Sequence, residues 1–360
     1  MESKSSRIKR LFPGGNTSVG FYSYYQYVID VKNANRIFFL KGGPGVGKSS
    51  MMKKIGQRML EEGYNVEFHH CSADPDSIDA VVIPELNIGM IDGTAPHVID
   101  PKYPGAVDEV VNLGEYWNED SLRSSRDEII TAIEGNSNIY KRVYKYLGAA
   151  KLIHDDIEWI YCKAMDFDKL NDVTYDYLEE VFREAKKQNK QSGVRHLFGS
   201  AYTHKGHIDF ADTFVGTMKN IHYINGKDGT GKSTILKKVA ERAIEYGYNV
   251  DVYHEPLEPL KIESVVIEEL DLAITTNERF IDREKLNLNT LLNTEILEAY
   301  KEELRESEEL FNGMLDDARI NLGKSKKNHD IIESYYIPNI DFEGINKLTS
   351  ELIEKILNSK

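Results

Sequence analysis

Two glycine-rich segments have the residue types and the spacing of a phosphate-binding loop, or P-loop. Residues 42–49 read GGPGVGKS and residues 226–233 read GKDGTGKS, and both satisfy the pattern G-x-x-x-x-G-K-[ST]. The glycines permit positive φ and close approach of the backbone, so that successive amide groups can surround a phosphate. Each segment follows a short β-rich run and opens a helical pattern, whose dipole adds to the positive field. We therefore predict one nucleotide-binding site in each half of the chain.

Individual residues of the two loops have predicted roles. Lys48 and Lys232 are expected to neutralise β- and γ-phosphate oxygens, and the hydroxyls of Ser49 and Ser233 are expected to bind Mg²⁺. The nucleotide-binding residues predicted in the first loop are Gly42, Gly43, Pro44, Gly45, Val46, Gly47, Lys48, Ser49 and Ser50. Those predicted in the second loop are Gly226, Lys227, Asp228, Gly229, Thr230, Gly231, Lys232, Ser233 and Thr234.

An acid that can orient the metal ion follows only the first loop at the usual distance. Residues 88–92 (IGMID) have the pattern of an apolar strand that ends in a carboxylate, so Asp92 is predicted to reach Mg²⁺ through water. The corresponding run of the second half, LAITT, ends at Thr276. Three other acids remain candidates there, although none lies at the usual strand end: Glu263, Glu269 and Asp271. We therefore expect the chemistry in the first half, and nucleotide binding with poor hydrolysis in the second.

Residues 92–115 (DGTAPHVIDPKYPGAVDEVVNLGE) have no similar segment in the second half. In a functional interpretation, His97 and Asp100 face the γ-phosphate and orient water or a phosphoryl acceptor. Alternatively, the segment is a connector whose polar side chains cap turns. We favour the functional interpretation because loops at the carboxyl ends of parallel strands bind ligands in α/β folds. The predicted catalytic residues are then Lys48, Asp92, His97 and Asp100.

The two halves resemble each other beyond these loops. A shift of 184 residues aligns 42–49 with 226–233, and it also aligns 62–66 with 246–250. The same blocks occur in the same order in both halves, which predicts an internal duplication. We place the first copy at residues 1–190 and the second copy at residues 191–360, with the junction in a polar stretch.

Strand and helix patterns alternate within each copy. Helices are expected at 49–62 and 233–246, and long amphipathic helices are expected at about 119–165 and 284–336, each followed by a final helix. This alternation predicts an α/β fold in which each copy has a mainly parallel sheet and a long helical insertion. Together with the two loops, it predicts a duplicated P-loop NTPase fold.

The long helices share the pattern H-D-x-x-E-x-x-Y, at residues 154–161 and again at 329–336. Histidine and glutamate four residues apart lie on one helix face, as zinc ligands often do. Two ligands on one helix are too few for a metal site, and the residues can equally be packing contacts inherited by both copies. We favour the packing interpretation.

Composition limits the partners that the chain can have. A net charge of −14 argues against a broad nucleic-acid surface, because duplex binding depends on neutralising phosphates with lysine and arginine. No apolar run approaches the roughly 20 residues that a membrane span needs. The only two cysteines, Cys71 and Cys162, suit a reducing compartment without a disulfide framework, so we expect a cytoplasmic protein.

The two P-loops, together with DGTAPH at 92–97 and DPKYPGAVDE at 100–109, resemble an uncharacterised bacterial family of tandem P-loop ATPases, also described as predicted nucleotide kinases. The resemblance covers essentially the whole chain, and DGTAPH is more specific than either loop. It implies ATP binding and a P-loop fold, and it implies no particular substrate.

Two functions follow as hypotheses. In the first, the protein is a Mg²⁺-dependent ATPase, or an ATP-dependent phosphotransferase with a small-molecule acceptor, active in the first copy. In the second, it is a non-catalytic nucleotide-sensing or regulatory module whose long helices are the output surface. ATP is favoured over GTP because the nearest candidate for a guanine-specific N-K-x-D motif, residues 225–228, lies inside the second P-loop.

Overall fold

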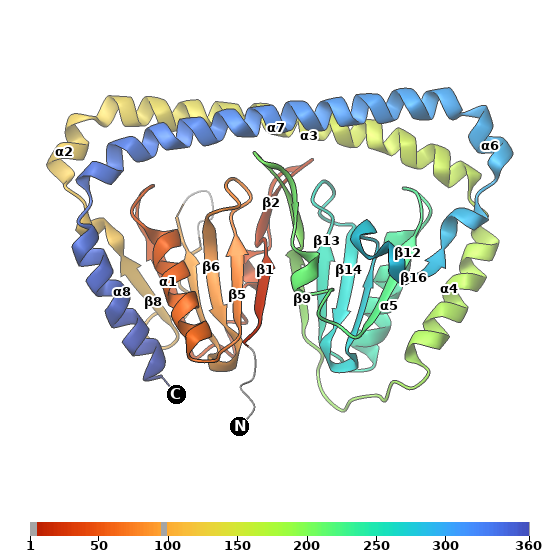
Figure 1. Ribbon diagram of the computed structural model, residues 1–360, viewed down its shortest axis with the longest axis horizontal. Helices are drawn as coiled ribbons and strands as arrows, with labels where there is room; N and C mark the ends of the chain where they lie inside the picture. The colour runs from red at the N-terminus through yellow and green to blue at the C-terminus, as the bar shows by residue number, and fades with distance from the viewer. Residues whose placement is uncertain (1–5, 95–98, 360) are drawn as a thin grey trace.

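The chain folds into two α/β units that are spanned by two long helices (Figure 1). The computed structural model describes residues 6–94 and 99–359. The strands of the first unit are β1 (Ile8–Leu11), β2 (Gly14–Thr17), β3 (Gly20–Ser23), β4 (Arg36–Lys41), β5 (Val66–His70), β6 (Ile78–Ile83), β7 (Ile88–Asp92) and β8 (Asp108–Asn112). Those of the second unit are β9 (Val194–Phe198), β10 (Ser200–Thr203), β11 (Gly206–Asp209), β12 (Asn220–Asn225), β13 (Val250–His254), β14 (Ile262–Ile267), β15 (Leu272–Thr275) and β16 (Glu284–Asn287).

The helices differ greatly in length. They are α1 (Lys48–Glu61), α2 (Glu119–Ser124), α3 (Arg126–Ala164), α4 (Phe167–Phe182), α5 (Lys232–Glu245), α6 (Thr294–Ala299), α7 (Lys301–Tyr336) and α8 (Phe342–Leu357). The helices α1 and α5 directly follow the two P-loops, as the sequence predicts. Their apolar faces lie on the sheets: α1 buries Met52, Ile55 and Met59, and α5 buries Leu236 and Val239.

The two main sheets have corresponding strand orders. The first sheet runs β1-β5-β6-β7-β4-β8, and the second, read from the matching edge, runs β9-β13-β14-β15-β12-β16. In each sheet one strand, β6 or β14, is antiparallel to its neighbours and the remaining pairs are parallel. The predicted α/β class is therefore confirmed, with mixed and mostly parallel sheets. In each sheet the P-loop strand, β4 or β12, lies between two parallel neighbours.

The units meet at the edge strands β1 and β9. Phe12 and Phe198, which follow or end these strands, exchange both backbone hydrogen bonds, with N–O distances of 2.9 and 3.1 Å. Ion pairs between side chains of the two units lie at the same boundary. Lys9 lies 3.3 Å from Asp251 of the other unit, and Arg195 donates to both carboxylate oxygens of Glu67. The two sheets are thus joined by paired backbone and by reciprocal ion pairs.

Each long helix crosses from one unit to the other, so the helix that follows it, α4 after α3 and α8 after α7, packs on the opposite unit. Figure 1 shows α3 and α7 side by side and antiparallel above both sheets. At the far end of α3, α4 packs against α5 of the second unit, where Tyr177 and Phe182 join the core. At the end of α7, α8 returns to α1 of the first unit, where Leu352 and Ile356 are buried. The chain boundary predicted between residues 190 and 191 therefore separates each terminal helix from the sheet that it covers.

Several elements differ from the sequence prediction. The sequence predicts that residues 284–287 begin a long helix, but they form the strand β16, which pairs with β12. The helix α7 begins only at Lys301, after the short helix α6. Strand β8 occupies the same place beside β4. Short runs such as EKLN have no strong periodicity, so only the free edge of the neighbouring P-loop strand determines their strand conformation.

Candidate functional site

The first P-loop connects β4 to α1. Gly45 and Gly47 have φ values of 69° and 90°, a region that favours glycine, and this lets the backbone turn tightly around the N-terminus of α1. The Nζ of Lys48 donates to the carbonyl oxygens of Gly42 and Gly43, at 2.8 and 2.9 Å. The positive charge of the lysine therefore lies over the loop, at the positive end of the helix dipole.

Asp92 lies beside this loop because β7 and β4 are parallel neighbours that end together, with Leu40 opposite Asp92. Its Oδ2 is 3.6 Å from the Nζ of Lys48, and its Oδ1 accepts a hydrogen bond of 2.9 Å from the backbone N of Thr94. The Oγ of Ser49 accepts a hydrogen bond of 3.0 Å from the backbone N of Ile78. A hydroxyl and a carboxylate at this loop are oxygen donors of the kind that Mg²⁺ prefers, so these residues fit that ion.

The segment after Asp92 is tied to the end of β4 by Lys41. The Nζ of Lys41 donates to the carbonyl oxygens of Gly93 and Ile99, at 2.6 and 3.1 Å, and lies 3.5 Å from the carboxylate of Asp100. The side chain of Asp100 is 81% exposed, so this is a surface ion pair. His97 lies outside the described residues. Asp100 is therefore near the loop edge of the sheet, with Lys41 as its partner.

The second P-loop has the same backbone form but a different lysine partner. Gly229 and Gly231 have φ values of 77° and 93°, and the Oγ of Ser233 accepts a hydrogen bond of 2.9 Å from the backbone N of Ile262. The Nζ of Lys232 donates to the carbonyl of Gly226 and lies 3.4 Å from Oδ1 of Asp228. The P-loop lysine of this site is therefore paired with a carboxylate of its own loop.

The position of Asp92 is occupied in the second unit by Thr276, whose backbone N donates to the carbonyl of Glu263 at 2.9 Å. Glu269 and Asp271 lie at the opposite edge of the sheet, where they accept hydrogen bonds from backbone groups at the start of other strands. Glu263 is thus the one of the three candidate acids at the P-loop edge. Burial raises its pKa to about 8, so it is mainly neutral at pH 7.

The end of α3 covers the second P-loop. The backbone carbonyl of Glu158 lies against Gly229 so closely that no Cβ fits there. The start of α4 also contributes, since a methyl group at Gly231 would lie 2.8 Å from Leu170. The imidazole of His154 pairs through Nε2 with Oδ2 of Asp228 and through Nδ1 with Oε1 of Glu258, both at 3.2 Å. A helix that begins in the first unit is therefore bound to the P-loop of the second.

The side chains around His154 include the residue types that bind metals, but they are arranged as a network of ion pairs. His154, Glu158 and Glu258 lie close enough to share an ion. However, the ammonium of Lys261 lies 2.5 Å from both Glu158 and Glu258. Burial opposes the charged form of His154, but hydrogen bonds to Asp228 and Glu258 outweigh it and raise its pKa to about 10. The first copy of the helical motif therefore takes part in an ion-pair network that joins α3 to the second P-loop.

The first P-loop is covered in the same way by the end of α7. A methyl group at Gly43 would lie 2.8 Å from Cε1 of Tyr336 and 2.9 Å from Cζ3 of Trp117. A methyl group at Gly45 would lie 2.9 Å from Cγ1 of Ile337. These neighbours are distant from the P-loop in the chain, so no local pattern predicts them. The repeated H-D-x-x-E-x-x-Y motif was the available signal, since both copies of it lie above a P-loop.

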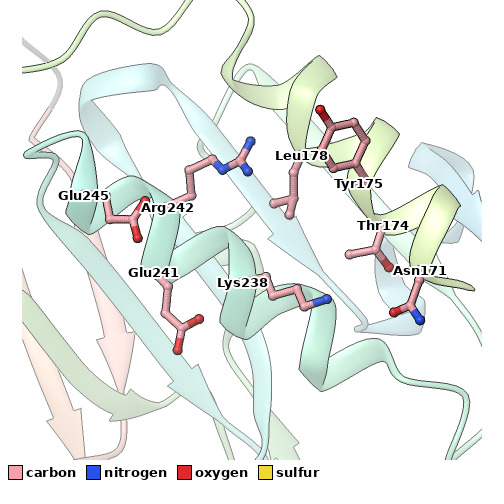
Figure 2. Close-up of a pocket in the computed structure, with 8 residues that line it drawn as sticks. All are labelled: Asn171, Thr174, Tyr175, Leu178, Lys238, Glu241, Arg242 and Glu245. Atoms are coloured by element: carbon pink, nitrogen blue, oxygen red, sulfur yellow. The ribbon is translucent and has the colours of Figure 1, made fainter.

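A separate groove lies between α4 and α5, away from the P-loop end of α5. Figure 2 shows its two walls, with Asn171, Thr174, Tyr175 and Leu178 on α4 and with Lys238, Glu241, Arg242 and Glu245 on α5. Arg242 pairs with Glu179 at 2.6 Å across the helices. These contacts fix α4 on the second unit, and they place the groove outside both phosphate loops.

A strand, a glycine loop with its lysine and a helix, arranged in this way, define a P-loop protein. Residues 20–357 match the model of the KAP family P-loop domain, and the chain belongs to this family of KAP NTPases. It is therefore a nucleotide-binding P-loop protein of the NTPase class, which confirms the predicted class. Comparisons with curated proteins and with solved structures gave no match.

In the described ranges 6–94 and 99–359, no helix is both long enough and apolar enough to cross a membrane.

Proposed function

We propose that the protein is an ATP-binding, Mg²⁺-dependent ATPase or ATP-dependent phosphotransferase whose chemistry takes place in the first unit. The observation that carries this proposal is the position of Asp92, whose carboxylate lies 3.6 Å from the ammonium of Lys48. The second unit has Thr276 at this position, and Lys232 is paired with Asp228 instead. Only the first site combines a phosphate loop with an acid at the end of the neighbouring strand.

Each residue of the first site has a specific role in this proposal. The backbone N–H groups of residues 43 and 45–47 bind the β-phosphate, whereas Pro44 has no N–H to donate. Lys48 stabilises negative charge on the transferred phosphoryl group. Ser49 and Asp92 hold Mg²⁺, which neutralises charge on the β- and γ-phosphates when it is bound. Asp100, together with His97, orients water or a small-molecule acceptor. The exposed carboxylate of Asp100 is free to turn toward a ligand because a surface ion pair with Lys41 is weak.

The second site, Gly226–Thr234 with Ser233 as its metal ligand, binds nucleotide but hydrolyses it slowly. Because Thr276 stands at the position of Asp92 and Glu263 is mainly neutral, neither Mg²⁺ nor the attacking water is oriented there. The two halves of the chain, residues 1–190 and 191–360, are copies of one ancestral sequence. Their matching strand orders support this origin, as does the bridge between Phe12 and Phe198, which are equivalent positions in the repeat.

A second candidate function is a nucleotide-sensing module. Its support is the contact of each P-loop with the end of a long helix from the other unit: Gly229 with Glu158 and Gly45 with Ile337. A nucleotide that enters either loop must share space with that helix end. Because α3 and α7 pack along each other, a shift of one helix end changes the position of the other.

Phosphate release distinguishes these functions. Under the catalytic proposal, Lys48→Ala abolishes release of phosphate from ATP, and Lys232→Ala leaves most of it. Release should be measured with ATP and with GTP, each with and without Mg²⁺. Nucleosides, nucleotides and small cofactors should then be screened as acceptors against a control without acceptor. A robust rate that neither variant changes would rule out the assigned roles, and tight ATP binding without turnover would favour the sensing module.

A further inference from the structure

A shallow pocket lies beside the first P-loop and is lined by residues 115–118 and 338–341. We propose that this pocket binds the nucleobase of the nucleotide whose phosphates lie in the first P-loop. The inference rests on the proposed function, and it adds a specific subsite to it. It assigns half of that subsite to the chain segment that follows α7, so the nucleotide site is completed by both halves of the chain.

The pocket is held in shape by backbone contacts between its two walls. The backbone N of Asn118 donates to the carbonyl of Asn339 at 2.8 Å, and the backbone N of Asp341 donates to the carbonyl of Tyr116 at 2.7 Å. Trp117 and Ile340 lie opposite each other in a short antiparallel bridge between these bonds. The walls are thus positioned before a ligand arrives, which lowers the entropic cost of binding.

Trp117, which lines the pocket, and the neighbouring Tyr336 both reach the phosphate loop. Strand β8 is parallel to β4, so the residues that follow β8 lie at the same sheet edge as the loop. The rings of Trp117 and Tyr336 both lie against Gly43, with centroids 6.1 Å apart and planes inclined by 50°. Both side chains are only half-buried, so ring surface remains for a ligand. A base attached to phosphates in this loop can therefore stack on an indole or a phenol ring.

The polar groups of the pocket suit a neutral base and not a second phosphate. Glu115 and Asp341 bring negative charge, which repels phosphate. The Oδ1 of Asn118 accepts from the backbone N of Ser121 and the Nδ2 of Asn339 donates to the carbonyl of Tyr335, which leaves the Nδ2 of Asn118 and the Oδ1 of Asn339 for a ligand. The exocyclic amine and ring nitrogens of a purine match such donors and acceptors. The pocket therefore distinguishes a nucleotide from the phosphate chain alone.

The second unit provides an internal comparison. There, the backbone N of Asn293 donates to the carbonyl of Ala164 at 2.8 Å, and Met165 is bridged to Leu292, so the same backbone clamp is present. The two aromatic residues Tyr116 and Trp117 are replaced by Leu291 and Leu292. The second unit keeps these backbone bonds and has Tyr161 at the position of Tyr336, but it lacks Tyr116 and Trp117, so we assign base recognition to the first unit.

The test compares ATP with inorganic tripolyphosphate, which can occupy the loop but has no base. Trp117 and Trp159 are the only tryptophans, so Trp159→Phe gives a protein with a single reporter indole at the pocket. In this background we expect ATP to change the fluorescence of Trp117 more than tripolyphosphate does. Affinities of both ligands should also be measured by calorimetry for Trp117→Leu, which copies the second unit, and for Leu292→Ala as the matched control.

We expect Trp117→Leu to weaken ATP binding by about tenfold, because stacking of one base contributes on the order of 1–3 kcal/mol. Binding of tripolyphosphate should be unchanged, which also shows that the variant is folded, and Leu292→Ala should change neither. Unchanged ATP affinity in Trp117→Leu overturns the base subsite and leaves the proposed function intact. Equal weakening of both ligands also overturns it, because Trp117 would then act on the loop itself. If the parent protein binds neither ligand, the proposed function fails, and the base subsite fails with it.

Discussion

The Nε2 of His154 lies 3.2 Å from Oδ2 of Asp228, so the long helix that leaves the first unit is paired with the phosphate loop of the second. The same imidazole binds Glu258, and its pKa of about 10 keeps it charged at neutral pH. The first unit has Pro44 at the position of Asp228, so this pair is specific to the second P-loop. It also makes the contact between the units sensitive to pH.

The His154 contact predicts a pH-dependent stability. The pKa of His154 in the folded protein is about 10 against an ordinary value of 6.5, so its stabilisation is complete below pH 6.5 and decreases as the pH rises to about 10. We expect His154→Gln to lower the free energy of unfolding by about 2 kcal/mol at about pH 6, and by much less at about pH 10. Urea denaturation at the two pH values measures this difference.

The matched control for that variant is His329→Gln. His329 occupies the equivalent position on α7, but its side chain is 43% exposed and lies 3.8 Å from Glu333. A change below about 0.5 kcal/mol is expected, because exposed pairs contribute little. An effect of His154→Gln that is the same at both pH values would contradict a charged imidazole at this site.

Asp92 is predicted to be required for turnover and not for nucleotide affinity. We expect Asp92→Asn to lower kcat by about 100-fold or more while KM for the nucleotide changes little, because the carboxylate acts on the metal and the transferring phosphate. Thr276→Val at the corresponding position of the second unit should leave kcat unchanged. Steady-state phosphate release gives both constants, and a kcat of Asp92→Asn near the parent value would exclude the first unit as the catalytic one.

The ion pairs between the sheets are predicted to stabilise the arrangement of the two units. Replacing Arg195 leaves the carboxylate of Glu67, whose side chain is 8% exposed, without its bidentate partner. We expect Arg195→Leu to lower the free energy of unfolding by about 3 kcal/mol. Arg305→Leu on the surface of α7, where the partners are exposed, should change it by less than about 0.5 kcal/mol. If chemical denaturation gives equal changes for the two variants, the buried pair contributes no more to the free energy of unfolding than the exposed one.

Gly229 is predicted to tolerate no side chain while the end of α3 lies on it. Its φ is 77°, and a Cβ would collide with the backbone carbonyl of Glu158. We expect Gly229→Ala to destabilise the protein by about 1–3 kcal/mol and to speed hydrogen exchange at residues 154–164. Gly313→Ala is the control: Gly313 lies within α7 with open space around its Cα, so the helix should gain up to about 1 kcal/mol. Unchanged exchange at the end of α3 would show that this contact does not hold the helix.

The phosphate loops could be predicted because their chemistry is local. The positions of Gly47, Lys48 and Ser49 in the chain fix a tight turn at the start of a helix, whatever the rest of the protein does. The strand that ends at Asp92 could also be predicted, because its apolar run is continuous. By contrast, residues 284–287 have no pattern of their own, and the prediction of helix there was wrong.

Residue type and spacing were enough to predict the class of the fold, the two P-loops and the difference between Asp92 and Thr276, because they act over one turn or one strand. Which unit each terminal helix covers, and which residues face each loop, depends on the tertiary structure. An amphipathic helix such as α4 buries its apolar face equally well on any matching surface. The partner of Gly43 or Gly229 was therefore set by the path of α3 and α7 between the units, and this path depends on packing far along the chain.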